Sequence, residues 1–301
     1  MSAAAGDAGV SPEAVLRALG HGDATVAEPV SGGSDTLLWR VRGAVGTGDQ
    51  ALRVLRADQE SVWRGEVAAM RTAEAGGVPV PRVAATGIWD GRPAMLLSWC
   101  AGRTLLEAAK ARPGDAARLG VAFGRMQARV HGIAAPPELS GQADTWITCA
   151  GPDEAALQAM LRAVARPSGG LLHLDYHPLN VLAEGGRISA VLDWTNARAG
   201  DRRADLARTL SILRLAPLPP GTPALPAALL RVLLMAGWCR GYQRVAGPWQ
   251  GMAPFHAWAG AAMARDLEPK IGRRGSWFQA RHLEPPRRWA NAWKRRAGIG
   301  V

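Results

Sequence analysis

The hydrophobic pattern of this 301-residue chain changes at Gly102, and that change limits the folds open to it. Before Gly102, short apolar segments alternate with turns rich in glycine, proline and aspartate, which is typical of antiparallel strands. After Gly102, the apolar residues mostly follow helical spacing. A sheet-forming third followed by a helix-forming remainder favours two lobes of unequal size. Hydrophobic residues make up 48% of the chain, which is enough for a sizeable core.

The first hundred residues predict a small antiparallel sheet with one inserted helix. Residues 1–10 are expected to be disordered, and Ser11-Pro12-Glu13 has the pattern of a helix start. Gly76-Gly77 ends the inserted helix, because the prolines that follow prevent its continuation. The expected strands cover 26–30, 36–42, 51–55, 83–88 and 94–99, and the inserted helix covers 61–75.

Beyond Gly102 the pattern predicts helices interrupted by one strand-like island. The island comprises 171–174 and a hairpin over 181–193. The expected helices cover 104–111, 115–133, 153–165, 204–213, 224–245 and 254–267. The predicted architecture is therefore α+β and bilobal, with a small antiparallel-sheet lobe over 11–101 and a larger, mainly helical lobe over 102–301.

Polar residues concentrate in the segment His173-Leu-Asp-Tyr-His-Pro-Leu-Asn180 and at Asp193-Trp194. Asn180 and Asp193 offer the oxygen ligands that Mg²⁺ bound to nucleotide phosphates prefers. Asp175 is then free to accept or orient a hydroxyl proton. Two alternatives stay open at this point. In the first, His173, Asp175 and His177 form a transition-metal site; in the second, these side chains have structural roles in turns and helix caps.

The pattern His-x-Asp-x-x-x-x-Asn with a following hydrophobic-Asp-Trp resembles the catalytic and magnesium loops of the aminoglycoside phosphotransferase and choline kinase family. Gly200-Asp-Arg-Arg-Ala-Asp205-Leu-Ala is similar to a further segment of that family. The resemblance covers roughly residues 25–240. It implies a protein-kinase-like fold, ATP or GTP as co-substrate, and Mg²⁺.

The resemblance also implies roles for individual residues. Asp175 corresponds to the catalytic aspartate, and Asn180 and Asp193 correspond to the metal ligands. The residues expected to support the loops structurally are His173, His177 and Asp205. Leu174 and Leu179 depart from the family pattern, because glycine often occupies both positions. We expect the two leucines to stiffen the loop and to narrow the acceptor pocket.

A kinase-like site also needs a cation on the nucleotide phosphates, carried by the third strand. Strand alternation places Ala51 and Arg53 on one face of that strand. Arg53 stands where protein kinases have lysine, and it keeps the charge with a different fork geometry. Glu66 is its expected partner, because it is central in the inserted helix. Glu60 and Glu74 are alternatives, and an unpartnered surface carboxylate at Glu66 stays open.

Two further segments of the first hundred residues are candidates for nucleotide contacts. The first is a glycine-rich turn, where backbone N–H groups can approach phosphate oxygens. It consists of Ser31, Gly32, Gly33 and Ser34. The second resembles the hinge of the family, whose backbone would meet the base, and it consists of Ser98, Trp99 and Cys100.

The distribution of charged residues along the chain bears on the acceptor, because the helical region after residue 209 is expected to line the acceptor pocket. From Thr209 to the end, 14 basic residues accompany only 3 acidic ones, so this stretch carries the whole net charge of +11. Aminoglycosides and choline are cations, whose binding calls for carboxylates or an aromatic cage. A neutral or anionic hydroxyl compound is therefore favoured over a polycation. A quaternary ammonium held by tryptophans stays open, with core packing as the simpler role of Trp238, Trp249, Trp258, Trp277, Trp289 and Trp293.

The sequence thus predicts a phosphotransferase that moves the γ-phosphoryl group of ATP or GTP to a small-molecule hydroxyl. Two alternatives are a nucleotide-binding regulatory pseudokinase, and a nucleic-acid-binding protein that uses the basic segment 281–296 with its interleaved tryptophans. We do not expect nucleic acid or membrane partners. Three separated cysteines and an N-terminus without a secretory pattern predict a soluble, cytoplasmic protein. The sequence does not determine the oligomeric state.

Overall fold

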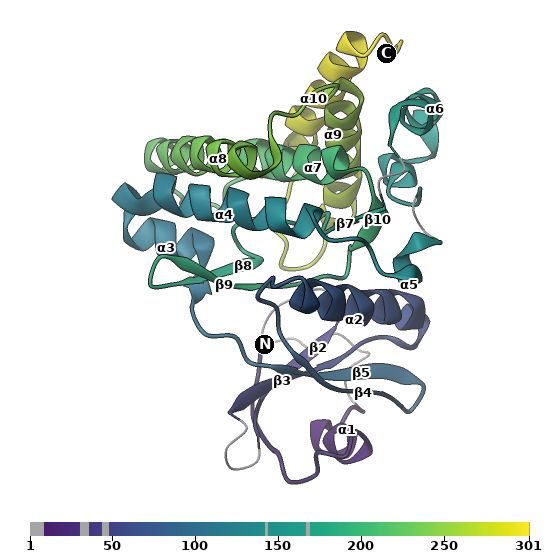
Figure 1. The fold of residues 1–301 in the computed structure, drawn as a ribbon, viewed down its shortest axis with the longest axis vertical. Helices are drawn as coiled ribbons and strands as arrows, with labels where there is room; N and C mark the ends of the chain where they lie inside the picture. The colour runs from purple at the N-terminus through teal and green to yellow at the C-terminus, as the bar shows by residue number, and fades with distance from the viewer. Residues whose placement is uncertain (1–8, 31–35, 44–47, 142–143, 167–168, 301) are drawn as a thin grey trace.

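The computed structural model describes residues 9–30, 36–43, 48–141, 144–166 and 169–300, and the fold has two lobes (Figure 1). The smaller lobe contains a five-stranded antiparallel sheet in the order β1-β2-β3-β5-β4. Its strands are β1 (Thr25–Pro29), β2 (Leu37–Arg42), β3 (Asp49–Val54), β4 (Val83–Trp89) and β5 (Arg92–Ser98). The predicted strands and the predicted inserted helix, α2 (Glu60–Ala75), are present within a few residues.

The two faces of this sheet are covered by different helices. On one face, Leu52 and Val54 pack with Val15 and Leu16 of α1 (Pro12–Ala18), whose N-cap is Ser11. On the other face, Met95 and Leu97 belong to the same buried cluster as residues of α2. Because side chains alternate along a strand, Arg53 of β3 shares the α2 face, which is turned toward the larger lobe.

The larger lobe is mainly helical (Figure 1). Its α-helices are α3 (Leu105–Ala111), α4 (Ala116–His131), α5 (Pro137–Ser140), α6 (Ala155–Val164), α7 (Arg202–Leu215), α8 (Ala224–Ala246), α9 (Ala253–Leu267) and α10 (Glu284–Arg296). Short 3₁₀ turns include η3 (Ile147–Ala150) and η4 (Pro152–Glu154). Two small sheets join them: β6 (Arg103–Thr104) with β8 (Val181–Glu184) and β9 (Arg187–Val191), and β7 (Gly170–Leu172) with β10 (Arg198–Gly200).

Four glycines let α4 and α8 lie against each other with their backbones in contact. A Cβ at Gly124 would overlap the carbonyl oxygen of Trp238, and one at Gly241 would overlap that of Val121. Gly120 and Gly237 are equally confined. The helix pair therefore depends on residues without side chains, as in other close helix packings.

Helix α8 agrees with the predicted helix over 224–245 to within one residue. By length and composition alone this 23-residue helix is apolar enough to cross a membrane, although such helices also occur in the cores of soluble proteins. Here it packs along α4, and Leu234 and Trp238 are buried in the core of the lobe. Leu225 and Leu229 of the same helix are exposed.

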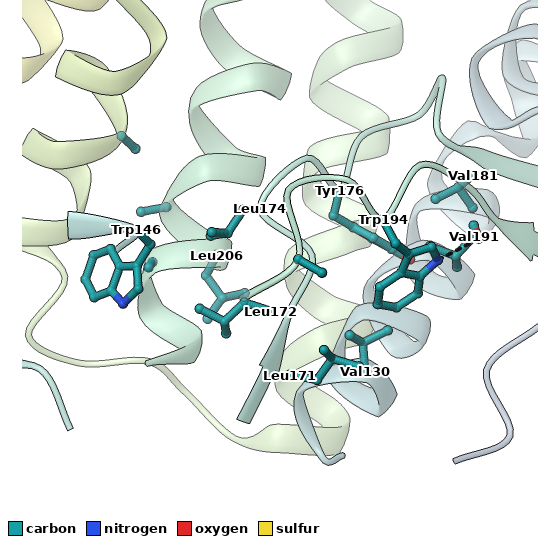
Figure 2. Close-up of a cluster of buried hydrophobic side chains, with 14 of the residues drawn as sticks. Val130, Trp146, Leu171, Leu172, Leu174, Tyr176, Val181, Val191, Trp194 and Leu206 are labelled. Carbon is teal, nitrogen blue, oxygen red and sulfur yellow. Dashed lines mark hydrogen bonds between the residues drawn. The ribbon is translucent and has the colours of Figure 1, made fainter. Parts of the chain in front are cut away.

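The core of the larger lobe directly supports the loops that carry the polar motifs. Figure 2 shows Leu172, Leu174 and Leu206 in one buried cluster, with Tyr176 and Trp194 further along it. Tyr176 is fully buried, stacks on Phe123 at 4.3 Å between ring centroids, and donates a hydrogen bond to the Phe123 carbonyl oxygen. The apolar side chains of the motif segments thus anchor these segments to the core of the larger lobe.

Candidate active site

Asp205 holds the start of the catalytic loop, which we define as residues 173–180. Its two carboxylate oxygens accept hydrogen bonds from the backbone N–H groups of His173 and Leu174, at 2.9 and 3.0 Å. The ring of His131 on α4 lies 2.9 Å from Asp205, and Tyr242 lies 2.9 Å from the other ring nitrogen. Burial raises the pKa of Asp205, but these hydrogen bonds and the charges of His131 and His173 lower it overall.

The side chain of His173 connects the catalytic loop to the segment around Asp193. Its Nε2 lies 2.9 Å from the carbonyl oxygen of Leu192, and its Nδ1 accepts from the backbone N–H of Asp175 at 3.3 Å. Its ring also contacts that of Trp194, with 4.7 Å between centroids. His173 is fully buried, and both of its ring nitrogens are used in these contacts. Its role is therefore to join the two loops.

Asp175, near the start of the loop, and Asn180, at its end, lie next to each other. The Asn180 amide donates to the backbone carbonyl and to Oδ2 of Asp175, at 3.1 and 3.0 Å. His177 Nε2 lies 3.5 Å from the same Oδ2. Burial alone would raise the pKa of Asp175, but the hydrogen bond and charge of His177, with the charges of Arg208 and His173, lower it to about 2. Asp175 is therefore ionised at neutral pH.

A backbone hydrogen bond holds Asp193 next to the catalytic loop. The N–H of Leu192 donates to the carbonyl oxygen of Asn180 at 2.7 Å, which joins the end of β9 to the end of the catalytic loop. Asp193 itself is exposed and has a φ of 59°, in the left-handed region that non-glycine residues rarely adopt. Such strain is found preferentially at functional positions.

The donors at this point fit a magnesium ion shared with nucleotide phosphates. Asn180 uses its amide nitrogen on Asp175, which leaves the amide oxygen for a metal, and Asp193 adds a carboxylate. Hard oxygen donors of this kind, few in number, are what Mg²⁺ takes from a protein when phosphates supply the rest. Across the described part of the chain, no group of three or more His, Cys, Asp or Glu side chains forms a metal site.

Arg53 and Glu66 form a buried ion pair across the smaller lobe. Arg53 Nη1 lies 2.5 Å from Glu66 Oε1, and the Glu66 side chain is only 1% exposed. Burial raises the pKa of Glu66 and the charge of Asp193 adds to the effect, while Arg53 opposes it. The predicted pairing is therefore present. Of the two alternatives, Glu60 instead pairs with Arg64 on the surface of α2.

Thr195, two residues beyond Asp193, joins this ion pair to the metal candidate, and the sequence analysis missed it. Its hydroxyl oxygen lies 2.7 Å from Asp193 Oδ1, 3.2 Å from Glu66 Oε2 and 3.0 Å from Arg53 Nη2. One short polar side chain thus connects the two lobes. Its place directly after Asp193-Trp194 was the only signal in the sequence.

The hinge segment offers fewer free donors than its sequence suggested. The backbone N–H of Ser98 donates to the carbonyl of Arg82 at 2.8 Å, and that of Trp99 donates to the carbonyl of Asp49 at 3.0 Å. A base at the hinge therefore has the N–H of Cys100 or the carbonyl oxygens to contact. The glycine-rich turn Ser31, Gly32, Gly33 and Ser34 lies outside the described residues.

Leu174 and Leu179 occupy different environments. Leu174 has a φ of 59°, which explains why glycine suits this position, and its side chain is buried beside Leu172 and Leu206 (Figure 2). The expectation that Leu174 narrows the acceptor pocket is wrong, because the side chain fills the core instead. Leu179 is 53% exposed.

Most of the tryptophans after Thr209 have packing roles. Trp238 and Trp258 are buried in the core. Trp289 and Trp293 of α10 pack on His256 of α9, and burial lowers the pKa of that histidine to about 4. The basic segment 281–296, which was a candidate for base stacking, is thus largely helix α10, with its tryptophans directed at α9.

The sheet lobe, the helical lobe and the polar loops at their junction define the class: a bilobal, protein-kinase-like phosphotransferase. A sequence model described as the phosphotransferase enzyme family matches residues 26–248, and the chain belongs to that family. No curated protein matches the sequence significantly. The chain is a small-molecule kinase by this membership.

Solved structures with the same fold match between 82% and 94% of this chain. The amicoumacin kinase hAmiN, solved with AMP-PNP and Ca²⁺, has a TM-score of 0.62 at 13% identity, over 94% of this chain and 92% of its own. An aminoglycoside-3'-phosphotransferase of type VIII has a TM-score of 0.58 at 22% identity, over 82% and 96%. A putative fructosamine-3-kinase from Haemophilus somnus has a TM-score of 0.56 at 14% identity, over 88% and 90%.

Proposed function

We propose that this kinase transfers the γ-phosphoryl group of ATP or GTP to a hydroxyl group of a neutral or anionic small molecule, with Mg²⁺. The observation that carries the proposal is that two sets of hydrogen-bonded side chains meet at the junction of the lobes. Asp175 and Asn180 lie together in one loop, and Asp193 is joined through Thr195 to the Arg53–Glu66 ion pair. These are the charges and donors that phosphoryl transfer requires.

Each side chain has a distinct task in this reaction. Arg53, oriented by Glu66, holds the nucleotide phosphates, and Asn180 and Asp193 hold the metal. When bound, Mg²⁺ supplies positive charge that neutralises the phosphate oxygens. Because Asp175 is ionised at neutral pH, it can accept a hydrogen bond from the acceptor hydroxyl and orient it.

The bond changes balance with these residues alone. The acceptor oxygen forms a bond to the γ-phosphorus, and the bond from that phosphorus to the β–γ bridging oxygen breaks. The hydroxyl proton passes to Asp175 and then to solvent. The products are a phosphate monoester and ADP or GDP, so catalysis rests mainly on positioning and on charge neutralisation.

The charge of the helical region after Thr209, which we expect to line the acceptor pocket, supports a neutral or anionic acceptor. The chain after Thr209 has 14 basic and 3 acidic residues. Cation–π contacts already occupy two of the candidate tryptophans: Arg214 lies over Trp289 at 5.4 Å and Arg296 over Trp293 at 4.5 Å. A quaternary ammonium ion would have to displace these arginines.

The test is a single-turnover transfer assay with Asp175→Ala and Asp175→Asn. We expect wild-type protein with MgATP or MgGTP to phosphorylate at least one compound in a broad panel of alcohols, and both variants to lose at least 100-fold of that rate. Asp23→Ala, which changes an exposed aspartate of the smaller lobe, is the control. Binding of MgATP without transfer to any member of the panel would instead support the regulatory pseudokinase.

A further inference from the structure

Helix α8 presents an apolar face that is largely exposed among the described residues. Leu225, Leu229 and Val232 are 84%, 60% and 54% exposed, and their spacing places them on the same side of the helix. Ala236 continues this line one turn further and is also exposed. We call these four residues the outer face of α8. Figure 1 shows α8 at the edge of the larger lobe, alongside α4.

The opposite side of α8 already provides the packing that the fold requires. Leu230, Leu234 and Trp238 lie on that side and are buried. The first half of α8 is therefore apolar all round, although the outer face remains open. Only 28% of the most apolar 18-residue stretch of this helix is buried. A helix that is apolar on all sides is normally enclosed by protein or by lipid.

Exposed apolar side chains are concentrated on this one helix. Eight large apolar side chains are exposed in the described part of the chain, and four of them belong to α8. The other four are scattered over separate segments: Ile88, Trp99, Val164 and Leu179. Single exposed apolar residues are common, whereas a contiguous group marks a surface that contacts another protein or a membrane.

The segment that contains the outer face carries positive charge and no negative charge. Residues 206–265 include six arginines and not one aspartate or glutamate. Arg240 and Arg244 are exposed in the last two turns of α8, beyond the apolar part of the helix. The main neighbour of α8, helix α4, also has no acidic residue. The occupant of the outer face must therefore be apolar beside the leucines and anionic beside the arginines.

These two properties favour a lipid surface over another protein. In a two-fold dimer of this chain the outer face would meet its own copy, so Arg240 and Arg244 would meet the same segment without carboxylates. A different protein would have to supply an apolar groove with acidic walls, because the outer face is the convex side of one helix. A bilayer with anionic headgroups offers apolar depth and negative charge without a matching shape.

We propose that the outer face of α8 binds the surface of a membrane that contains anionic lipids. Leu225, Leu229 and Val232 enter the boundary between headgroups and acyl chains, and Arg240 and Arg244 reach the lipid phosphates. The opposite side stays packed on α4, so the helix lies along the membrane and does not cross it. Membrane partners were not expected from the sequence, and binding of this kind is independent of the proposed phosphotransferase reaction.

Flotation of the full-length protein with lipid vesicles tests the proposal without any substrate. One set of vesicles consists of phosphatidylcholine, and the other is an equimolar mixture of phosphatidylcholine and phosphatidylglycerol. We expect the protein to bind the anionic vesicles at least about 10-fold more tightly than the neutral ones. Raising NaCl from about 0.1 M to about 0.5 M should remove most of this preference, because salt screens the attraction of the arginines to the headgroups.

A first pair of variants tests the apolar contribution. Leu225→Ser combined with Leu229→Ser should weaken binding to the anionic vesicles about 10-fold or more, since less apolar surface enters the bilayer. Both side chains are exposed, so the melting temperature should change little. The matched control is Ile88→Thr combined with Val164→Thr, which changes two exposed apolar residues outside α8. This control should bind like the wild-type protein.

A second pair tests the charge. Arg240→Gln combined with Arg244→Gln should weaken binding to the anionic vesicles about 10-fold and leave binding to the neutral vesicles unchanged. Its control is Arg17→Gln combined with Arg71→Gln, which removes the same charge from exposed positions of α1 and α2. The control should bind the anionic vesicles nearly as well as the wild-type protein.

Three results would overturn the proposal. The first is wild-type protein that floats with neither kind of vesicle. The second is equal binding of the wild-type protein and the Leu225→Ser, Leu229→Ser variant, because the net charge of +11 would then account for the attraction. The third is a wild-type dimer in analytical ultracentrifugation that this variant loses, without vesicle binding, which would assign the outer face to a second copy of the chain.

Discussion

Thr195 Oγ1 lies 2.7 Å from Asp193 Oδ1, so the residue proposed to hold the metal is positioned by a hydroxyl two residues further along the chain. The same oxygen lies within hydrogen-bond distance of Arg53 and Glu66 of the smaller lobe. A threonine hydroxyl has one proton, so it accepts from Arg53 and donates to one carboxylate at a time. The phosphate-binding pair and the metal ligand are thereby coupled through one atom.

Thr195→Val removes this link and keeps the shape of the side chain. We expect kcat/KM for MgATP to fall about 10-fold, since hydrogen bonds to charged groups contribute about 1.5–3 kcal/mol. Thr195→Ser should retain most of the activity. Steady-state kinetics at several Mg²⁺ concentrations provide the measurement, and a Thr195→Val protein with unchanged dependence on both Mg²⁺ and ATP would contradict the coupling.

His177→Ala should change the acid side of the pH profile. In the native protein His177 lowers the pKa of Asp175, mainly by its hydrogen bond and its charge, to about 2. Without His177 the two largest influences that lower the pKa of Asp175 are lost, so this pKa rises and Asp175 becomes protonated at higher pH. Because transfer requires the ionised form, the acid limb of kcat/KM should move to higher pH.

The same variant has a predicted effect on stability. The folded pKa of Asp175 lies below its ordinary value of 3.8, so its ionisation stabilises the fold above about pH 4 and this contribution is lost as the pH falls toward 2. His177→Ala should reduce that contribution, which thermal unfolding between pH 2.5 and 7 would measure. His21→Ala, which changes a histidine of the smaller lobe, is the control for both predictions. If the wild-type protein, His177→Ala and His21→Ala have the same acid limb of kcat/KM, the role of His177 is refuted.

Leu174 provides a test of backbone strain in the catalytic loop. Leu174→Ala loses buried surface, at a cost of about 2–5 kcal/mol, and keeps the unfavourable φ. Leu174→Gly loses the same surface but relieves the steric cost of about 1–2 kcal/mol. We therefore expect the glycine variant to be the more stable of the two in chemical denaturation.

The control for this comparison is Leu172, which is buried in β7 without a positive φ. There the glycine variant should be less stable than the alanine variant, because glycine loses more conformational entropy on folding. The same order at both positions would argue against strain at Leu174.

Gly124→Ala tests the close contact of α4 with α8. In an exposed helix this change stabilises by about 1 kcal/mol. At Gly124 the new Cβ would overlap the carbonyl oxygen of Trp238, so we expect a loss of about 3 kcal/mol or more in the free energy of unfolding. Gly141→Ala, where nothing lies within 4 Å, should change stability by less than about 0.5 kcal/mol. Equal melting temperatures for the two variants would contradict the packing argument.

Local patterns were sufficient to predict the strands, most of the helices and the placement of Asp175, Asn180 and Asp193 in loops that follow strand-like segments. These features depend on short stretches of sequence, where alternation, turns and motif spacing carry the information. The pairing of Arg53 with Glu66 was also within reach, because strand and helix periodicity place both side chains on inner faces.

Contacts between distant segments were not predictable in this way. Thr195 meets Arg53 across 142 residues, and no local pattern marks a threonine for such a role. Helix α10 was not among the predicted helices: the segment 281–296 was noted only for its basic residues and tryptophans, and its apolar face packs against α9.

Asp205 accepts hydrogen bonds from two consecutive backbone N–H groups at the start of the catalytic loop, and it does so from a fully buried position. The loop is therefore preorganised: the entropy of fixing Asp175 is lost once, during folding, and not again with each substrate. Differences in rate between acceptors should then reflect how well each acceptor fits, since the loop that receives them has one shape for all.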